Sequence, residues 1–176
     1  MGRSASLART ASRERGAGLR AVPENVWEYP RPPAVVAETR RVRAQLAGVL
    51  IADSTRALRV LETSHPPTIY VPLADVRVDL LCASEHPSSW CEFKGRAGYV
   101  DAMIGGRRFA AVGWRYEKPA AGYTELAGTV ALYPGRLEAA WLGDEPVAAQ
   151  AGDFYGGWIT SELVGPFKGG PGTVGW

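Results

Sequence analysis

Apolar and polar residues alternate with a period of two through much of the chain, which is the pattern of half-buried β-strands. Two pairs of such segments flank a glycine-containing dipeptide: 41–46 and 49–52 around Ala47-Gly48, and 97–104 and 107–117 around Gly105-Gly106. Glycine tolerates the positive φ angles of a two-residue hairpin turn. The pattern therefore predicts two β-hairpins.

The remaining β-prone segments are short and separated by turn residues. They are residues 57–62, 69–71, 76–80, 130–133 and 137–142. The last two flank Pro134-Gly135 and predict a further hairpin. Residues 82–96 predict a long polar loop, and residues 119–127 predict a helical turn. Within the return strand 107–117 we expect one face to hold Ala110, Val112, Trp114 and Tyr116.

Many short strands with frequent turn residues predict an all-β, mainly antiparallel fold: a sandwich, barrel-like or similar small single domain with little helix. Residues 1–24 are rich in Arg, Ser, Ala and Gly, which predicts a disordered arm. Residues 25–150 form the β domain, which opens with a Pro-rich entry strap at 26–33. Residues 151–176 are a Gly-rich tail, whose aromatic residues predict packing on the domain.

The net charge of +2 is unevenly distributed along the chain. Residues 1–24 hold five arginines and two glutamates, a net +3, which leaves −1 for residues 25–176. Nucleic-acid binders usually concentrate positive charge on the folded face, so we expect no nucleic-acid partner. No apolar stretch approaches the roughly 18 residues of a membrane helix. We expect a cytoplasmic protein without a membrane partner, and the sequence indicates no particular cofactor or oligomeric state.

Several sequence blocks resemble a known family. They read ADSTRALRVLETSHPPTIYVP (52–72), CEFKGRAGY (91–99), WRYEKP (114–119) and GTVALYP (128–134). In this order they are similar to the domain of unknown function 427 family, and the tail from residue 154 resembles that of its longer members. The resemblance implies a small β-tent-like domain of antiparallel strands. The family is sometimes labelled nucleotidyltransferase-like, so the resemblance also suggests that activity, but it identifies no catalytic residues.

Charged and aromatic residues alternate within these blocks and suggest a ligand pocket. The proposed ligand-binding residues are Arg56, His65, Tyr70, Lys94, Tyr99, Trp114 and Tyr116. Arginine and histidine can hold a phosphate or carboxylate, and aromatic rings can line an apolar pocket. The alternative is structural: Arg56 paired with Glu62 or Asp75, and the aromatic residues packed as core. Our leading hypothesis is a β-domain that binds a small, partly anionic molecule.

Two other functions remain open. An enzyme could use Cys91 as a nucleophile, because an ammonium group such as that of Lys94 favours the thiolate. It could instead transfer nucleotides with magnesium, although the sequence has no close Asp-x-Asp pair. An interaction module would use the entry strap and the tail. The spacing of Cys82, His86 and Cys91 matches no standard zinc pattern, so we predict no metal site.

Overall fold

The computed structural model of the protein describes residues 22–173 and 175–176, and the arm predicted over 1–24 lies outside them except for its last three residues. The largest sheet has eight strands and antiparallel pairing throughout. Its order is β2 (Ala34–Ala37), β5 (Leu58–Leu61), β6 (Thr68–Pro72), β11 (Thr129–Leu132), β10 (Arg107–Arg115), β9 (Gly95–Ile104) and β7 (Leu81–Ala83), and β8 (Ser89–Cys91) also pairs with β9. The prediction of an all-β, mainly antiparallel fold is confirmed, and the sheet does not close into a barrel.

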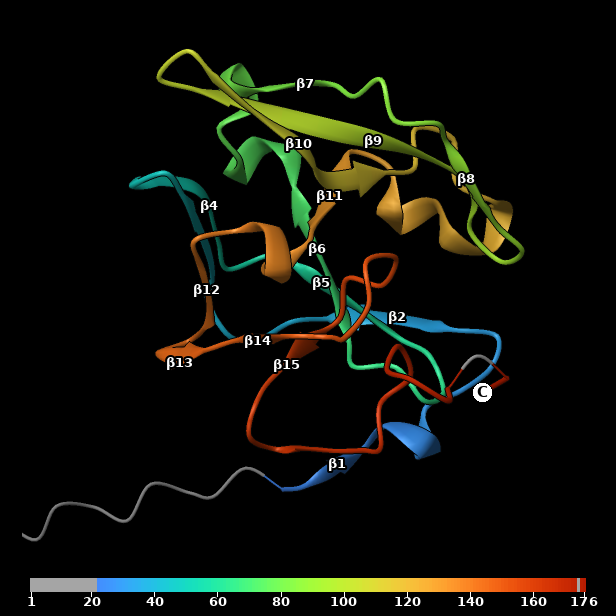
Figure 1. The fold of residues 1–176 in the computed structure, drawn as a ribbon. Coiled ribbons are helices and arrows are strands. Elements are labelled where there is room, and N and C mark those ends of the chain that lie inside the picture. The colour runs from blue at the N-terminus through green and yellow to red at the C-terminus, as the bar shows by residue number, and fades with distance from the viewer. Residues whose placement is uncertain (1–21, 174) are drawn as a thin grey trace, which may run out of the picture.

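A second sheet has four strands, in the order β13 (Glu145–Pro146), β12 (Ala139–Leu142), β3 (Val42–Leu46) and β4 (Val49–Ser54). Two short ribbons complete the β-structure: β1 (Glu24–Asn25) with β16 (Leu163–Val164), and β14 (Ala148–Ala149) with β15 (Trp158–Ile159). Five 3-10 turns connect strands: η1 (Val26–Glu28), η2 (Leu73–Asp75), η3 (Val78–Leu80), η4 (Ala121–Leu126) and η5 (Pro134–Arg136). Figure 1 shows β9 and β10 at one end of the molecule and β1 at the other, with β14 and β15 between them. No helix among the described residues is long and apolar enough to cross a bilayer.

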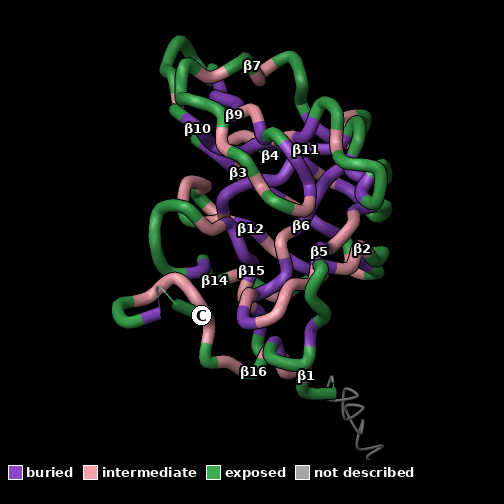
Figure 2. The backbone as a smooth tube through the Cα atoms, turned by 90° about the vertical axis from the view of Figure 1, so that its right-hand side faces the viewer, coloured by how far each residue is buried: buried purple, intermediate pink, exposed green. Residues whose placement is uncertain are grey.

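The four central strands of the main sheet, β6, β11, β10 and β9, each contribute side chains to two separate apolar clusters, because successive residues point to opposite faces. On β6, Ile69 and Val71 join the cluster that fills the space against the second sheet. Tyr70 between them joins a mostly aromatic cluster on the opposite face. Figure 2 shows the buried segments concentrated in the middle of the molecule, with the exposed ones in connecting loops. The main sheet therefore has a core face and an aromatic face.

Both hairpins predicted around glycine-containing dipeptides are confirmed. β3 and β4 pair across Ala47-Gly48, and β9 and β10 pair across Gly105-Gly106. Gly105 and Gly106 both have positive φ, at 57° and 77°, as the turn requires. The alternation of residues together with this turn chemistry is thus sufficient to locate both hairpins.

The prediction that Val112 shares a face with Trp114 is wrong, because β10 contains a bulge between Phe109 and Gly113. Asp101 holds the bulge open: its carboxylate accepts hydrogen bonds from the backbone N–H of Ala111 at 2.7 Å and from Arg108 Nε at 2.5 Å. The irregularity puts Val112 in the core cluster and leaves Trp114 in the aromatic cluster.

The strand predicted over 76–80 is also wrong. These residues contain η3 instead, where the guanidinium of Arg77 donates to both carboxylate oxygens of Asp79, at 2.8 and 2.6 Å. Val78 is 52% exposed, so its side chain supplies little of the burial that would favour a strand. The polar loop predicted over 82–96 is interrupted by β7 and β8, which both pair with β9.

Residues 130–133 and 137–142 do not form the predicted hairpin. β11 pairs with β6 and β10 in the main sheet, whereas β12 pairs with β3 and β13 in the second sheet. Between them, η5 turns the chain out of the main sheet. Arg136 secures this turn by donating to the carbonyl oxygens of Ala111, at 2.6 Å, and Asp153, at 3.0 Å.

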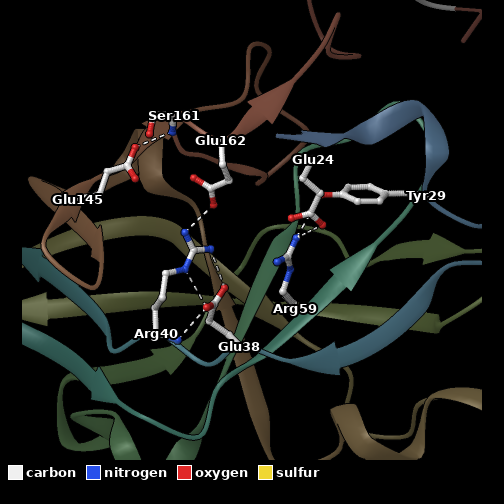
Figure 3. A network of polar contacts seen from close by, with 8 residues as sticks. All are labelled: Glu24, Tyr29, Glu38, Arg40, Arg59, Glu145, Ser161 and Glu162. Carbon is white, nitrogen blue, oxygen red and sulfur yellow. Dashed lines mark hydrogen bonds and ion pairs between the residues drawn. The ribbon is translucent and has the colours of Figure 1, made fainter. Parts of the chain in front are cut away.

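Buried ion pairs attach both ends of the described chain to the sheets (Figure 3). Glu38, 3% exposed, accepts from the backbone N–H and Nε of Arg40, both at 2.9 Å, and from Arg40 Nη2 at 3.0 Å. Arg40 Nη1 also donates to Glu162 at 2.6 Å, which ties the C-terminal segment to the body. Arg59 does the same for β1 by donating to Glu24 at 2.6 Å.

Candidate functional site

The aromatic face of the main sheet carries the side chains that shape a cavity. Tyr70 on β6, Tyr99 on β9 and Trp114 on β10 point to this face because they occupy alternate positions of paired strands. Tyr116 and Tyr133 extend the face just beyond the ends of β10 and β11. Five aromatic side chains, on or just beyond four consecutive strands of the sheet, are thereby gathered on one surface.

A cavity of about 220 Å³ opens over this face. Residues of β8, the segment that follows Gln150, and Lys168 also line it. Six of the seven side chains predicted to bind a ligand line it: His65, Tyr70, Lys94, Tyr99, Trp114 and Tyr116. The volume lies below the roughly 300–1,000 Å³ of drug-sized pockets, so it suits a molecule built on a single ring.

Arg56 is the predicted residue that does not line the cavity. Its guanidinium is 64% exposed and donates to Asp75 at 2.5 Å, while Ser54 Oγ donates to the second oxygen of the same carboxylate at 2.7 Å. Arg56 lies in the bend between β4 of the second sheet, which ends at Ser54, and β5 of the main sheet, which begins at Leu58. The structural alternative of an Arg56–Asp75 pair is therefore the one found.

Hydrogen bonds fix the aromatic walls. The indole Nε1–H of Trp114 donates to the Tyr70 hydroxyl at 3.2 Å, and the Tyr99 hydroxyl donates to Ser89 Oγ at 3.0 Å. Burial raises the pKa of Tyr70, and it raises the pKa of Tyr116, next to Tyr70 and Cys91, in the same way. Both phenols therefore stay protonated at neutral pH, as neutral hydrogen-bonding groups.

His65 lies at the polar end of the cavity, with its ring tilted against Tyr155 at a centroid distance of 4.8 Å. Its Nδ1 faces the side-chain nitrogen of Gln150 at 3.1 Å. Burial lowers the pKa of His65 to about 4; Glu62 opposes this shift, and the positive charges of Lys168, Lys94 and Arg31 add to it. The imidazole is therefore neutral at pH 7.

Among the residues that line the cavity, cations outnumber carboxylates. Lys94, whose side chain is 9% exposed, lies 3.6 Å from Glu62, and Arg31 lies 3.3 Å from the same carboxylate. Lys168 approaches from the tail, with its Nζ 5.9 Å from the centre of the Tyr155 ring. Three cations and one carboxylate thus line the cavity, but two of the cations have partners just outside it: Arg31 donates to Glu92 at 2.6 Å, and Lys168 Nζ donates to the oxygen of Trp176.

Several lining residues come from segments that sequence patterns did not connect with the pocket. Arg31 belongs to the entry strap, and Gln150, Tyr155 and Lys168 belong to the region after the second sheet. The Gly-Gly pair at 156–157 is the local signal that could have indicated this contact. A Cβ on Gly156 would lie 2.3 Å from the Trp114 ring, so only glycine lets the tail lie flat on the cavity wall.

Cys91, the candidate nucleophile, lines the cavity at the end of β8 and is half-buried. Cys82 is exposed, and both thiols are free. Within 22–173 and 175–176, no three His, Cys, Asp or Glu side chains lie close enough together to hold a metal ion. Of the three nearby residues Cys82, His86 and Cys91, only Cys91 lines the aromatic cavity.

The fold and the site together define a class: an antiparallel β-protein with an aromatic, positively charged cavity on the outer face of its main sheet. The chain belongs to the family described as domain of unknown function (DUF427), whose sequence profile matches residues 34–143. The predicted family membership is thus confirmed. Comparison with curated proteins gives no match. The matched region contains the aromatic wall, whereas Arg31, Gln150 and Lys168 lie outside it.

Proposed function

We propose that the cavity binds a small organic anion that contains a planar or aromatic part. The observation that carries this proposal is the composition of the lining, in which eight aromatic side chains surround three cations and one carboxylate. Aromatic rings favour contact with a flat apolar group, and Lys and Arg favour a carboxylate or phosphate. The polar groups gather at the end of the cavity where His65 lies, which gives the ligand one orientation.

The position of Lys94 supports an anionic ligand. Its side chain is almost fully buried, and its nearest carboxylate, on Glu62, is shared with Arg31. A buried charge is costly unless it is paired. Arg31 has a closer partner in Glu92, at 2.6 Å, whereas the contact of Lys94 with Glu62 is 3.6 Å long. An incoming carboxylate or phosphate could approach Lys94 more closely than Glu62 does, so we expect the anion to lie near Lys94.

Thermal-shift and calorimetric titrations test the proposal with three probes of similar size: benzoate, phenyl phosphate and the uncharged benzyl alcohol. A ligand present at a hundred times its Kd stabilises the folded state by about 2.7 kcal/mol. For a protein of this length that raises Tm by roughly 5–10 °C. We expect at least one of the two anions to do so and benzyl alcohol to fall well short of it.

Two matched variants locate the effect. Lys94→Met removes a cation inside the cavity, and Arg56→Met removes a cation outside it. We expect Lys94→Met to weaken binding of the anion about tenfold or more, as the loss of a charge-assisted contact does, and Arg56→Met to leave its Kd unchanged. Equal effects of the two variants would refute the proposal, as would the absence of any stabilising anion.

A further inference from the structure

Gln150 is a buried side chain in contact with the ring of His65. It is 5% exposed and follows β14, so its side chain has little freedom to turn. Three of its contacts are polar: Oε1 accepts from the backbone N–H of Gly157 at 3.0 Å, Nε2 donates to the carbonyl oxygen of Lys168 at 2.7 Å, and Nε2 faces His65 Nδ1 at 3.1 Å.

The two backbone contacts determine which end of the amide is which. A backbone N–H can only donate and a backbone carbonyl can only accept, so the amide oxygen must face Gly157 and the amide nitrogen must face Lys168. The second hydrogen of Nε2 then points at Nδ1 of His65. That ring nitrogen must accept the bond with its lone pair, which leaves the imidazole proton on the other nitrogen, Nε2.

We propose that Gln150 is a positioning residue that holds His65 as the neutral Nε2–H tautomer, so that His65 presents a hydrogen-bond donor to an anionic ligand. Within the described part of the chain, His65 Nε2 has no hydrogen-bond partner, although its ring lines the cavity. The donor therefore remains available to a molecule in the cavity. This proposal deepens the proposed function and rests on it for the part that concerns the ligand.

The surroundings favour a neutral donor over an imidazolium. The charged groups near the ring are Glu62, Lys168, Lys94 and Arg31, of which three are cations that oppose a further positive charge. Protonation of Nδ1 would also bring an N–H against the amide hydrogens of Gln150, and one hydrogen bond would be lost. The Nε2–H donor should consequently persist across the neutral pH range, and anion binding through it should not depend on histidine titration there.

Long-range ¹H–¹⁵N NMR of the full-length, ¹⁵N-labelled chain without ligand tests the tautomer directly. The chain has only two histidines, and a His86→Asn variant assigns the signals. We expect the His65 signals of the Nε2–H tautomer at pH 7, unchanged down to pH 5.5. An Nδ1–H tautomer or an imidazolium at pH 7 would overturn the proposal, whatever the protein binds.

Gln150→Leu provides the second measurement, since leucine fills similar space and cannot donate to His65. We expect mixed tautomers at His65 and a Kd for benzoate about five- to tenfold higher, the range for loss of one hydrogen bond. The double variant His65→Phe/Gln150→Leu should then bind benzoate as His65→Phe does. If Gln150→Leu leaves the tautomer unchanged, the positioning role is refuted. If benzoate does not bind the wild type, the Kd measurements use phenyl phosphate, and failure of both anions to bind would refute only the proposed function.

Discussion

The buried carboxylate of Glu38 allows a direct test of how burial determines the value of an ion pair in this protein. In the Glu38→Gln variant the side chain keeps its shape but loses its charge. The amide oxygen can still accept from the backbone N–H and Nε of Arg40, but the amide nitrogen would face Arg40 Nη2, which now donates to Glu38 at 3.0 Å. One hydrogen bond is lost outright, and two become neutral-acceptor bonds.

The expected cost follows from these contacts. Removing one partner of a fully buried pair costs about 3–5 kcal/mol. Here Arg40 is 29% exposed and keeps its bond to Glu162, so we expect the lower figure of about 2–3 kcal/mol. Asp53→Asn is the matched control, because Arg41 also donates twice to Asp53, but the two side chains are 55% and 35% exposed. Its cost should not exceed about 1 kcal/mol.

Urea unfolding at pH 7, followed by circular dichroism, measures both variants. With a slope of about 1–3 kcal/mol per molar urea, Glu38→Gln should lower the midpoint by roughly 1 M or more, with the slope unchanged. The midpoint for Asp53→Asn should move much less. If both variants shift the midpoint equally, burial does not determine the strength of these pairs, and the reasoning is refuted.

The same pair predicts a pH dependence. Burial alone would raise the pKa of Glu38, but the hydrogen bonds and charge of Arg40 outweigh it and leave the pKa lowered. A lowered folded-state pKa contributes stability above the unfolded value near 4.3, and this contribution is lost as pH falls through the folded-state pKa. The stability difference between wild type and Glu38→Gln should therefore be full at pH 7 and shrink steadily below about pH 4.

Two further predictions concern the cavity. Gly156→Ala places a methyl group 2.3 Å from the Trp114 ring, so it should lower the free energy of unfolding by about 1–3 kcal/mol and change the near-UV circular dichroism. Gly122→Ala is the control, because Gly122 has open space around it, and it should do neither. An unchanged spectrum in Gly156→Ala would contradict the packing described. Iodoacetamide should modify the exposed thiol of Cys82 faster than the half-buried thiol of Cys91, and bound benzoate should slow the modification of Cys91 alone. Mass spectrometry of the labelled peptides measures both rates. Equal protection of the two thiols would argue against benzoate in this cavity.

Local patterns predicted the features that depend on local chemistry. The Gly105-Gly106 turn located the β9–β10 hairpin, and alternation placed Tyr70, Tyr99 and Trp114 on strands whose side chains meet. Strand partners were harder to predict, because β11 and β12 are neighbours in sequence but belong to different sheets. The bulge in β10 depends on the Asp101 carboxylate, which no period-two pattern records.

The polar end of the cavity could not be predicted for a related reason. Gln150 and Lys168 reach it only because the chain returns from the second sheet and lies over the aromatic face. Arg56 looked like a site residue because it lies among motif residues, but its backbone follows a strand of the other sheet. Closeness in sequence therefore predicted which side chains share a face of one strand, but it did not predict which residues from different sheets lie together.

The two faces of the main sheet separate the residues that line the cavity from the residues that hold the two sheets together. Ile69 and Val71 hold the sheets together, while Tyr70 between them borders the cavity. A substitution at the middle position alters the lining of the cavity without changing the side chains that pack between the two sheets. The lining of this cavity can therefore change while the packing that holds the fold together stays the same.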